Sequence, residues 1–169
     1  MARPKLTPEV AYNLAVALYA ASGECDIRLE NVIAQSSYYA YRYARDVLKG
    51  PWPEGESVIA TDAWSAYRYA SEILMSPFPE AEPVIAQDAK YAYWYARYVL
   101  KGPWPEAEAV IAQDAYTAYH YARNVLQVPW PDAESVIAQE LEAAYWYDRH
   151  VLKTPKDKAR FKEVRRWLA

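Results

Sequence analysis

Apolar and polar residues recur along this chain with a fixed period of 26 residues. The tripeptide Pro51-Trp52-Pro53 returns as Pro77-Phe78-Pro79, Pro103-Trp104-Pro105 and Pro129-Trp130-Pro131. An apolar triplet keeps the same step, at Val32-Ile33-Ala34, Val58-Ile59-Ala60, Val84-Ile85-Ala86, Val110-Ile111-Ala112 and Val136-Ile137-Ala138. A period of this size is typical of stacked repeats, in which no single unit can bury its apolar face alone.

Each repeat contains the signals for two helices. The segment from Pro105 to Gln113 predicts a short helix, because proline suits the first helical turn and acidic residues favour its positive end. Asp114 is then a suitable N-cap for a longer helix that runs to about Leu126. In other copies glycine follows this helix, at Gly50 and Gly102, and we expect it to adopt the left-handed conformation that closes a helix.

The pattern therefore predicts an all-α protein, an α/α solenoid of five 26-residue helix-hairpin repeats in one continuous domain. Residues 1–24 form the predicted N-terminal capping helix, since Ala11 to Ala15 resemble Ala40 to Ala44. Residues 25–154 hold the five repeats, and 155–169 form a basic C-terminal capping helix. The two ends differ from the repeats because a stack needs terminal units that do not continue it.

Two columns of tyrosine do not vary between repeats. They hold ten of the 17 tyrosines: Tyr41, Tyr67, Tyr93, Tyr119 and Tyr145, and Tyr43, Tyr69, Tyr95, Tyr121 and Tyr147. We expect these rings to fill space between neighbouring repeats, with each hydroxyl bonded to a backbone group or a carboxylate. The alternative is a tyrosine ladder that stacks bases or relays electrons.

Acidic and basic columns are nearly as constant. The acidic column is Glu30, Glu56, Glu82, Glu108 and Glu134; the basic column is Arg45, Arg97, Arg123 and Arg149, interrupted by Ser71. Because catalysis needs one organised site rather than five copies, the pattern predicts a structural ladder. Bidentate arginine–glutamate links between adjacent repeats are its expected form.

The opposite edge of each longer helix varies from repeat to repeat, and it is the candidate binding face. On a helical wheel its aromatic and basic members are Tyr38, Arg42, Trp64, Arg68, Trp94, Tyr98, Tyr116, His120, Trp146 and His150. Trp, Tyr and Arg dominate binding hot spots, whereas an ordinary solvated helix face favours Lys and Glu. The alternative is that these rings pack on neighbouring side chains.

The charge balance limits the classes of partner. The chain carries a net charge of −3, but residues 153–169 carry +5, so the preceding body carries −8. A phosphate-binding footprint is therefore missing from the body and is possible only at the tail. One cysteine and no apolar run of membrane-spanning length predict a protein of the cytoplasm, or of the host cytoplasm if the protein is viral, with no membrane association.

Several kinds of chemistry lack their usual residues. His120 and His150 have no second imidazole or cysteine at metal-ligand spacing, so we expect no metal site and no cofactor. The four glycines are scattered and form no phosphate-binding loop. We therefore expect no enzymatic activity.

The helix-hairpin architecture is similar in principle to tetratricopeptide and Sel1-like solenoids, although those repeats are longer. The segment from Tyr91 to Glu108 resembles more closely a short repeat of uncharacterised phage and bacterial proteins, and the resemblance covers residues 25–154. It implies a phage-encoded factor that acts on host machinery, and it brings no functional residues of its own.

Three functions fit this sequence. The leading hypothesis is a non-catalytic module that binds a protein partner through the variable face. The alternative is a binder that sequesters a nucleotide or another small anion, or nucleic acid, with Arg42, Arg68 and His120 on phosphate. Formation of a homodimer through the aromatic face is compatible with either function.

Overall fold

The computed structural model of the protein describes residues 6–152, and throughout this range the chain is helical, with no strand. The predicted C-terminal capping helix over 155–169 lies outside the described residues. None of the helices in the described range is both long and apolar enough to cross a membrane.

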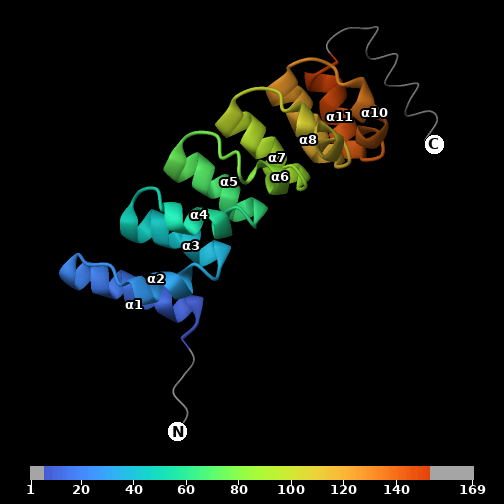
Figure 1. The fold of residues 1–169 in the computed structure, drawn as a ribbon. Coiled ribbons are helices and arrows are strands. Elements are labelled where there is room, and N and C mark those ends of the chain that lie inside the picture. The colour runs from blue at the N-terminus through green and yellow to red at the C-terminus, as the bar shows by residue number, and fades with distance from the viewer. Residues whose placement is uncertain (1–5, 153–169) are drawn as a thin grey trace. The chain divides into compact units, whose positions relative to one another are not determined.

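The chain divides into two compact units, which we call unit 1 (Met1–Ile85) and unit 2 (Ala86–Ala169). The helices of unit 1 are α1 (Pro8–Ser22), α2 (Ile27–Ile33), α3 (Ser37–Tyr43), α4 (Pro53–Ile59), α5 (Ala63–Tyr69) and α6 (Glu82–Ile85) (Figure 1). Those of unit 2 are α7 (Ala89–Tyr95), α8 (Pro105–Ile111), α9 (Ala115–Tyr121), α10 (Pro131–Ile137) and α11 (Leu141–His150).

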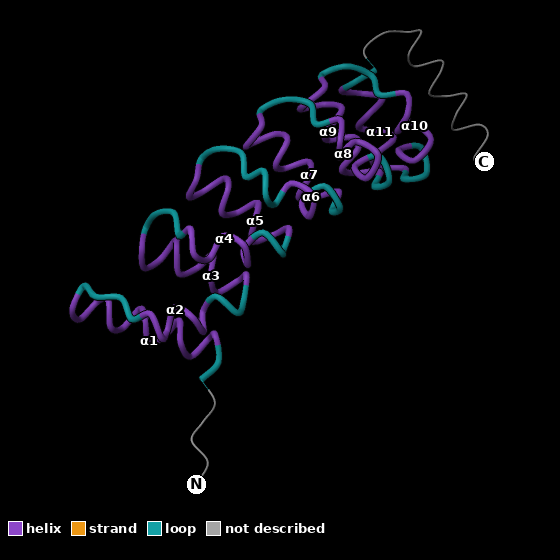
Figure 2. The backbone as a smooth tube through the Cα atoms, in the orientation of Figure 1, coloured by secondary structure: helices purple, strands orange, loops and turns teal. Residues whose placement is uncertain are grey.

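Within each unit the helices alternate with short connections and contact their neighbours along the chain (Figure 2). In unit 1, α3 contacts α4 and α5, and α1 contacts α2 and α3. In unit 2, α9 contacts α7 on one side and α11 on the other. The predicted all-α fold of stacked helix hairpins is confirmed, and an N-terminal helix lies where the N-terminal cap is expected.

Aspartates cap three of the longer helices, α5, α7 and α9, and the sequence predicts the cap at Asp114. The carboxylate of Asp114 accepts a hydrogen bond from the backbone N–H of Thr117 at 2.8 Å. Asp62 and Asp88 bind the N–H three residues ahead in the same way. Each cap satisfies a donor that the first helical turn leaves without a backbone partner.

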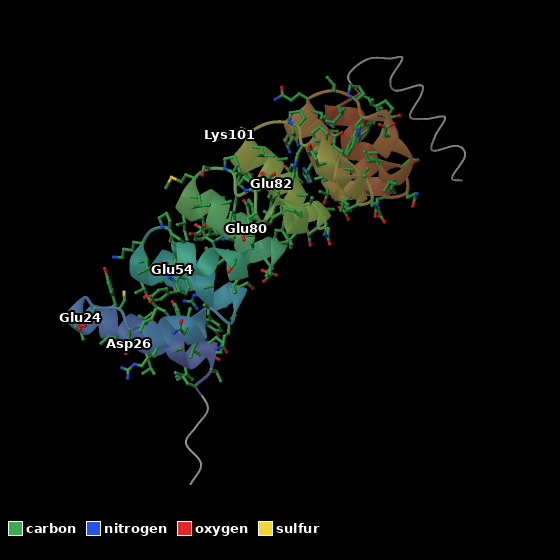
Figure 3. All side chains as sticks on the ribbon, in the orientation of Figure 1. Glu24, Asp26, Glu54, Glu80, Glu82 and Lys101 are labelled. Carbon is green, nitrogen blue, oxygen red and sulfur yellow. The ribbon has the colours of Figure 1, made fainter. Side chains whose placement is uncertain are left out.

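The ends of four longer helices differ from the prediction. After the α-helical part, each makes a π-helical turn, over Ala44–Leu48, Ala70–Leu74, Ala96–Leu100 and Ala122–Leu126. The residue that then adopts the left-handed conformation is Lys49, Met75, Lys101 or Gln127, with φ between 51° and 59°. The expectation that Gly50 and Gly102 adopt it is wrong, because the wider turn brings the residue before each glycine to that position. Figure 3 shows Lys101 in the connection between α7 and α8.

The second tyrosine column forms the core, together with the aromatic residue of each proline-rich turn. Tyr43, Tyr69, Tyr95, Tyr121 and Tyr147 are completely buried. The hydroxyl of Tyr69 accepts the backbone N–H of Trp52 at 2.8 Å and donates to Glu56 Oε1 at 2.8 Å. The indole of Trp52 meanwhile packs against Tyr43 of the preceding helix, with ring centres 4.9 Å apart.

Unit 2 repeats this arrangement twice. Tyr121 joins the Trp104 N–H to Glu108, and Tyr147 joins the Trp130 N–H to Glu134. The prediction that these rings fill space while their hydroxyls bind backbone or carboxylate groups is thus confirmed for Tyr43, Tyr69, Tyr121 and Tyr147. The side of each longer helix that faces away from this core carries the candidate site.

Candidate functional site

The predicted structural ladder exists in a different form. Glu56, Glu108 and Glu134 accept hydrogen bonds from the buried tyrosines. The arginines donate instead to the first tyrosine column: Arg45 to Tyr41 at 3.0 Å, Arg97 to Tyr93 at 2.6 Å, Arg123 to Tyr119 at 3.0 Å and Arg149 to Tyr145 at 3.5 Å. The expected arginine–glutamate pairing is therefore wrong at these positions. Each arginine lies one helical turn after its tyrosine, so the two side chains meet on one face.

In unit 1 the structure brings the predicted face residues together. The rings of Tyr38 and Trp64 stack with their centres 5.6 Å apart. The guanidinium of Arg42 lies 4.6 Å from the ring centre of Tyr12, and that of Arg68 lies 5.8 Å from the ring centre of Trp64. Neighbouring helices therefore contribute alternating aromatic and cationic groups to one surface.

The three arginines of this surface are engaged by two carboxylates within unit 1. Asp46 binds Arg45 at 2.6 Å and Arg42 at 3.3 Å, and Glu72 binds Arg68 at 2.5 Å. The hydrogen bonds from Arg45 are the main reason that the pKa of Asp46 is lowered to about 2. Arg42 and Arg68, which the nucleotide hypothesis assigns to phosphate, are thus already engaged with carboxylates.

Unit 2 carries two adjacent depressions on the corresponding face. The first has a volume of about 360 Å³ and is lined by Lys90, Tyr93, Trp94, Arg97, Tyr98, Tyr116, Thr117 and His120. The second has a volume of about 310 Å³ and is lined by Tyr116, Tyr119, His120, Arg123, Glu142, Trp146 and His150. Tyr116 and His120 belong to both, so together the two depressions form one surface, which we call the unit 2 face.

Aromatic rings give the unit 2 face its shape. His120 lies between Tyr119 and Tyr93, with ring centres 4.7 Å and 6.1 Å away. In the second depression the rings of Trp146 and His150 stack nearly parallel, 5.1 Å apart. Tyr98 and Tyr116 are 51% and 41% exposed, so the face presents large apolar area to solvent.

The hydroxyls of Tyr41, Tyr93 and Tyr119 of the first column, and that of Tyr12 on α1, each contact a residue of the next longer helix. The type of that residue differs between the units. In unit 1 it is acidic: the Tyr12 hydroxyl donates to Asp46 at 2.6 Å, and that of Tyr41 donates to Glu72 at 2.5 Å. In unit 2 it is an amide or an imidazole. Asn124 Nδ2 lies 2.9 Å from the Tyr93 hydroxyl, and His150 Nδ1 lies 2.7 Å from that of Tyr119.

The presence of Asn124 and His150 where unit 1 has carboxylates changes the charge of the face. Arg97 and Arg123 are exposed, and among the described residues neither they nor Lys90 lie within 4.0 Å of a carboxylate oxygen. Glu142 lines the second depression and accepts a hydrogen bond from the Tyr116 hydroxyl at 2.9 Å. Burial lowers the pKa of His120, and the nearby Arg123 and Arg97 lower it further. The unit 2 face is therefore cationic through its guanidinium and ammonium groups.

Sequence reasoning placed Arg97 and Arg123 in a structural ladder, whereas the structure places both on the candidate face. The signal was present in the spacing, because Lys90, Trp94 and Arg97 lie at i, i+4 and i+7 and so share one helix stripe. It was missed because the arginine column is nearly constant, which suggested a purely structural role. An arginine that recurs at the same position of the repeats can also belong to a binding surface, which then presents the same group in each repeat.

The chemistry available to this site is recognition through hydrogen bonds, ring contacts and charge. Among residues 6–152, no three histidine, cysteine, aspartate or glutamate side chains gather so that they could hold a metal ion. No protein-family model matches the chain, and no curated protein or solved structure matches it either.

Proposed function

We propose that this protein is a non-catalytic binding module that engages a protein partner through the variable aromatic and basic face, with unit 2 as the main contact. One observation carries the proposal. The arginines on the face of unit 1 are engaged by carboxylates, whereas Arg97 and Arg123 are held in place by tyrosine hydroxyls and keep their charge uncompensated.

The composition of the unit 2 face supports a protein partner. Arginine, tryptophan and tyrosine are the residues that contribute most to protein–protein binding energy, and here they lie side by side. Hydrogen bonds to Tyr93 and Tyr119 hold the two guanidiniums, so less side-chain entropy is lost when a partner binds. The two depressions share Tyr116 and His120 and follow one another across the longer helices, which suits an extended surface contact.

The alternative, a small anionic ligand such as a nucleotide, requires cations that are available. In unit 1 the arginines assigned to that role are neutralised by Asp46 and Glu72. The remaining candidates in unit 2 lie in two linked depressions along a surface. A partner that spans both depressions uses this arrangement better than one small molecule does.

Site-specific photo-crosslinking tests the proposal. A photoreactive phenylalanine analogue replaces Tyr98 on the unit 2 face and, in a control chain, exposed Tyr19 on α1. We expect a polypeptide adduct from position 98 that is lost when Arg97 and Arg123 are both changed to alanine, and no such adduct from position 19. Equal adducts from both positions, or retention only of a small molecule in native mass spectrometry, would overturn the proposal.

A further inference from the structure

The unit 2 face presents equivalent positions on two longer helices, one repeat apart, and both end in an arginine. Lys90, Trp94 and Arg97 form a stripe on the first longer helix, and Tyr116, His120 and Arg123 form the equivalent stripe on the next. Each stripe places one guanidinium at its end, beside a tyrosine hydroxyl. The face thus contains two equivalent positions for an anionic group, each flanked by aromatic rings.

Hydrogen bonding prepares the first position for an anion. The Tyr93 hydroxyl accepts from Arg97 at 2.6 Å and from the Asn124 side-chain amide at 2.9 Å. With two hydrogen bonds accepted, the hydroxyl hydrogen of Tyr93 is available to an incoming acceptor. In unit 1 the equivalent hydrogen, on Tyr41, is already donated to Glu72. A carboxylate at the first position can therefore bind both the guanidinium and the phenol.

The distance between the two positions follows from helix packing. The longer helices α7 and α9 contact each other directly, and packed helices lie roughly 8–10 Å apart. A polyproline II peptide rises roughly 3.1 Å per residue and has three residues per turn, so residues i and i+3 share a face about 9 Å apart. A peptide crossing the helices in this conformation presents one side chain to each position.

The aromatic rings that line the two depressions suit a polyproline II peptide as well. Grooves that recognise polyproline II peptides are lined by aromatic side chains, which pack against the flat faces of an extended, already ordered ligand. Tyr116 and His120 line both depressions, and His120 is near both Arg97 and Arg123. A small or proline residue between two acidic residues would lie against these rings.

We infer that the unit 2 face binds an extended acidic peptide of a protein partner, in polyproline II conformation, with acidic residues at every third position. Arg97 and Arg123 each bind one carboxylate, and aromatic rings of the two depressions contact the intervening residues. This inference rests on the proposed function and specifies the chemistry of the partner. It concerns only contacts within unit 2.

Fluorescence anisotropy with defined peptides tests the inference on the full chain. The probe is a fluorescein-labelled peptide of four Glu-Pro-Pro repeats. A second peptide has the same composition with its four glutamates adjacent, and a third carries lysine in place of glutamate. We expect the repeating glutamate peptide to bind at least tenfold more tightly than the clustered one, and the lysine peptide not to bind.

Matched variants assign the binding to the two guanidiniums. Arg97→Ala and Arg123→Ala should each weaken binding of the repeating peptide by about tenfold or more, since each removes a charge-assisted hydrogen-bonding group. Arg28→Ala should leave binding unchanged, because Arg28 is exposed on α2 and paired with Asp26. Thermal unfolding of each variant verifies that the fold is retained.

The inference is overturned if the two glutamate peptides bind equally, if Arg28→Ala weakens binding as much as the other variants, or if a single-stranded oligonucleotide of equal charge binds more tightly. These outcomes are separable from failure of the proposed function. Crosslinking from position 98 that depends on Arg97 and Arg123 would still show a protein partner, and the error would then lie in the peptide's chemistry alone.

Discussion

The Tyr119 hydroxyl lies 2.7 Å from Nδ1 of His150, in the relationship that joins Tyr41 to Glu72 in unit 1. The backbone arrangement is the same in both units, but the partner of the hydroxyl is acidic in unit 1 and an amide or imidazole in unit 2. A single column of the repeat thereby determines whether the neighbouring arginines are neutralised. The same fold can carry a neutralised face in one part and a cationic face in another.

The buried tyrosine hydroxyls are expected to stabilise the hairpins. Tyr69→Phe should lower the free energy of unfolding by about 1–3 kcal/mol, because the Trp52 N–H would remain buried without an acceptor. Tyr145→Phe is the matched control, since Tyr145 is half exposed and should change stability by about 0.5 kcal/mol or less. Chemical denaturation measures both, and equal effects would show that the hydroxyl of Tyr69 has no special role.

The left-handed residue after each π-helical turn is expected to be a site of stabilisation. Lys101→Gly should raise the free energy of unfolding by about 1 kcal/mol, because a non-glycine residue at positive φ is disfavoured by about that amount. Gly102→Ala should change it little, since a methyl group at this position meets no atom within 4 Å. If Gly102→Ala were the more harmful change, glycine rather than lysine would be the residue that closes this helix.

Asp46 is expected to make unit 1 sensitive to acid. Its pKa is lowered from 3.8 to about 2 in the folded protein, so its contribution is present above pH 3.8 and is lost as the pH falls toward 2. Asp46→Asn should therefore cost roughly 1 kcal/mol at pH 7, a modest value because the carboxylate is partly solvated. The stability difference between wild type and variant should shrink toward zero near pH 2. A difference that stays constant with pH would show that the ion pairs with Arg45 and Arg42 are not its cause.

Neighbouring aromatic residues are expected to separate folding from binding. Tyr95 is completely buried, so Tyr95→Ala should cost about 3 kcal/mol or more by opening a cavity. Trp94 is only half buried and lines the unit 2 face, so Trp94→Ala should leave the unfolding temperature nearly unchanged while weakening binding to the acidic peptide. Similar losses of thermal stability in both variants would show that Trp94 belongs to the core.

Much of the fold could be predicted from the chain's periodicity. The 26-residue period predicts the helix pairs, and Asp114 predicts where a longer helix begins, because packing and capping follow local rules. In the two repeats that contain Gly50 and Gly102, the closing residue of the longer helix was predicted one position too late. The sequence pattern did not predict the π-helical turn that brings Lys49 and Lys101 to positive φ.

The candidate site was predicted less completely. Helical spacing predicts the variable face, including Trp94, His120 and Trp146, because residues on one stripe of a helix lie on the same side. The partners of the arginines were not predicted, because a repeat period does not show which of several nearby acceptors a long side chain will reach. Only the structure shows that Arg97 binds the Tyr93 hydroxyl and lines a depression.

One substitution on the unit 2 face is expected to change its charge without destabilising the fold. Asn124 directly follows Arg123, as Asp46 directly follows Arg45 in unit 1, where the carboxylate neutralises the guanidinium. Asn124→Asp should therefore neutralise Arg123 and reduce binding of the repeating glutamate peptide by about tenfold or more, with the unfolding temperature unchanged or slightly raised. Asn124→Ala, which removes the amide without adding charge, should bind the peptide far more tightly than Asn124→Asp. If the two variants bind the peptide equally, the uncompensated charge of Arg97 and Arg123 is not what makes this face a binding site.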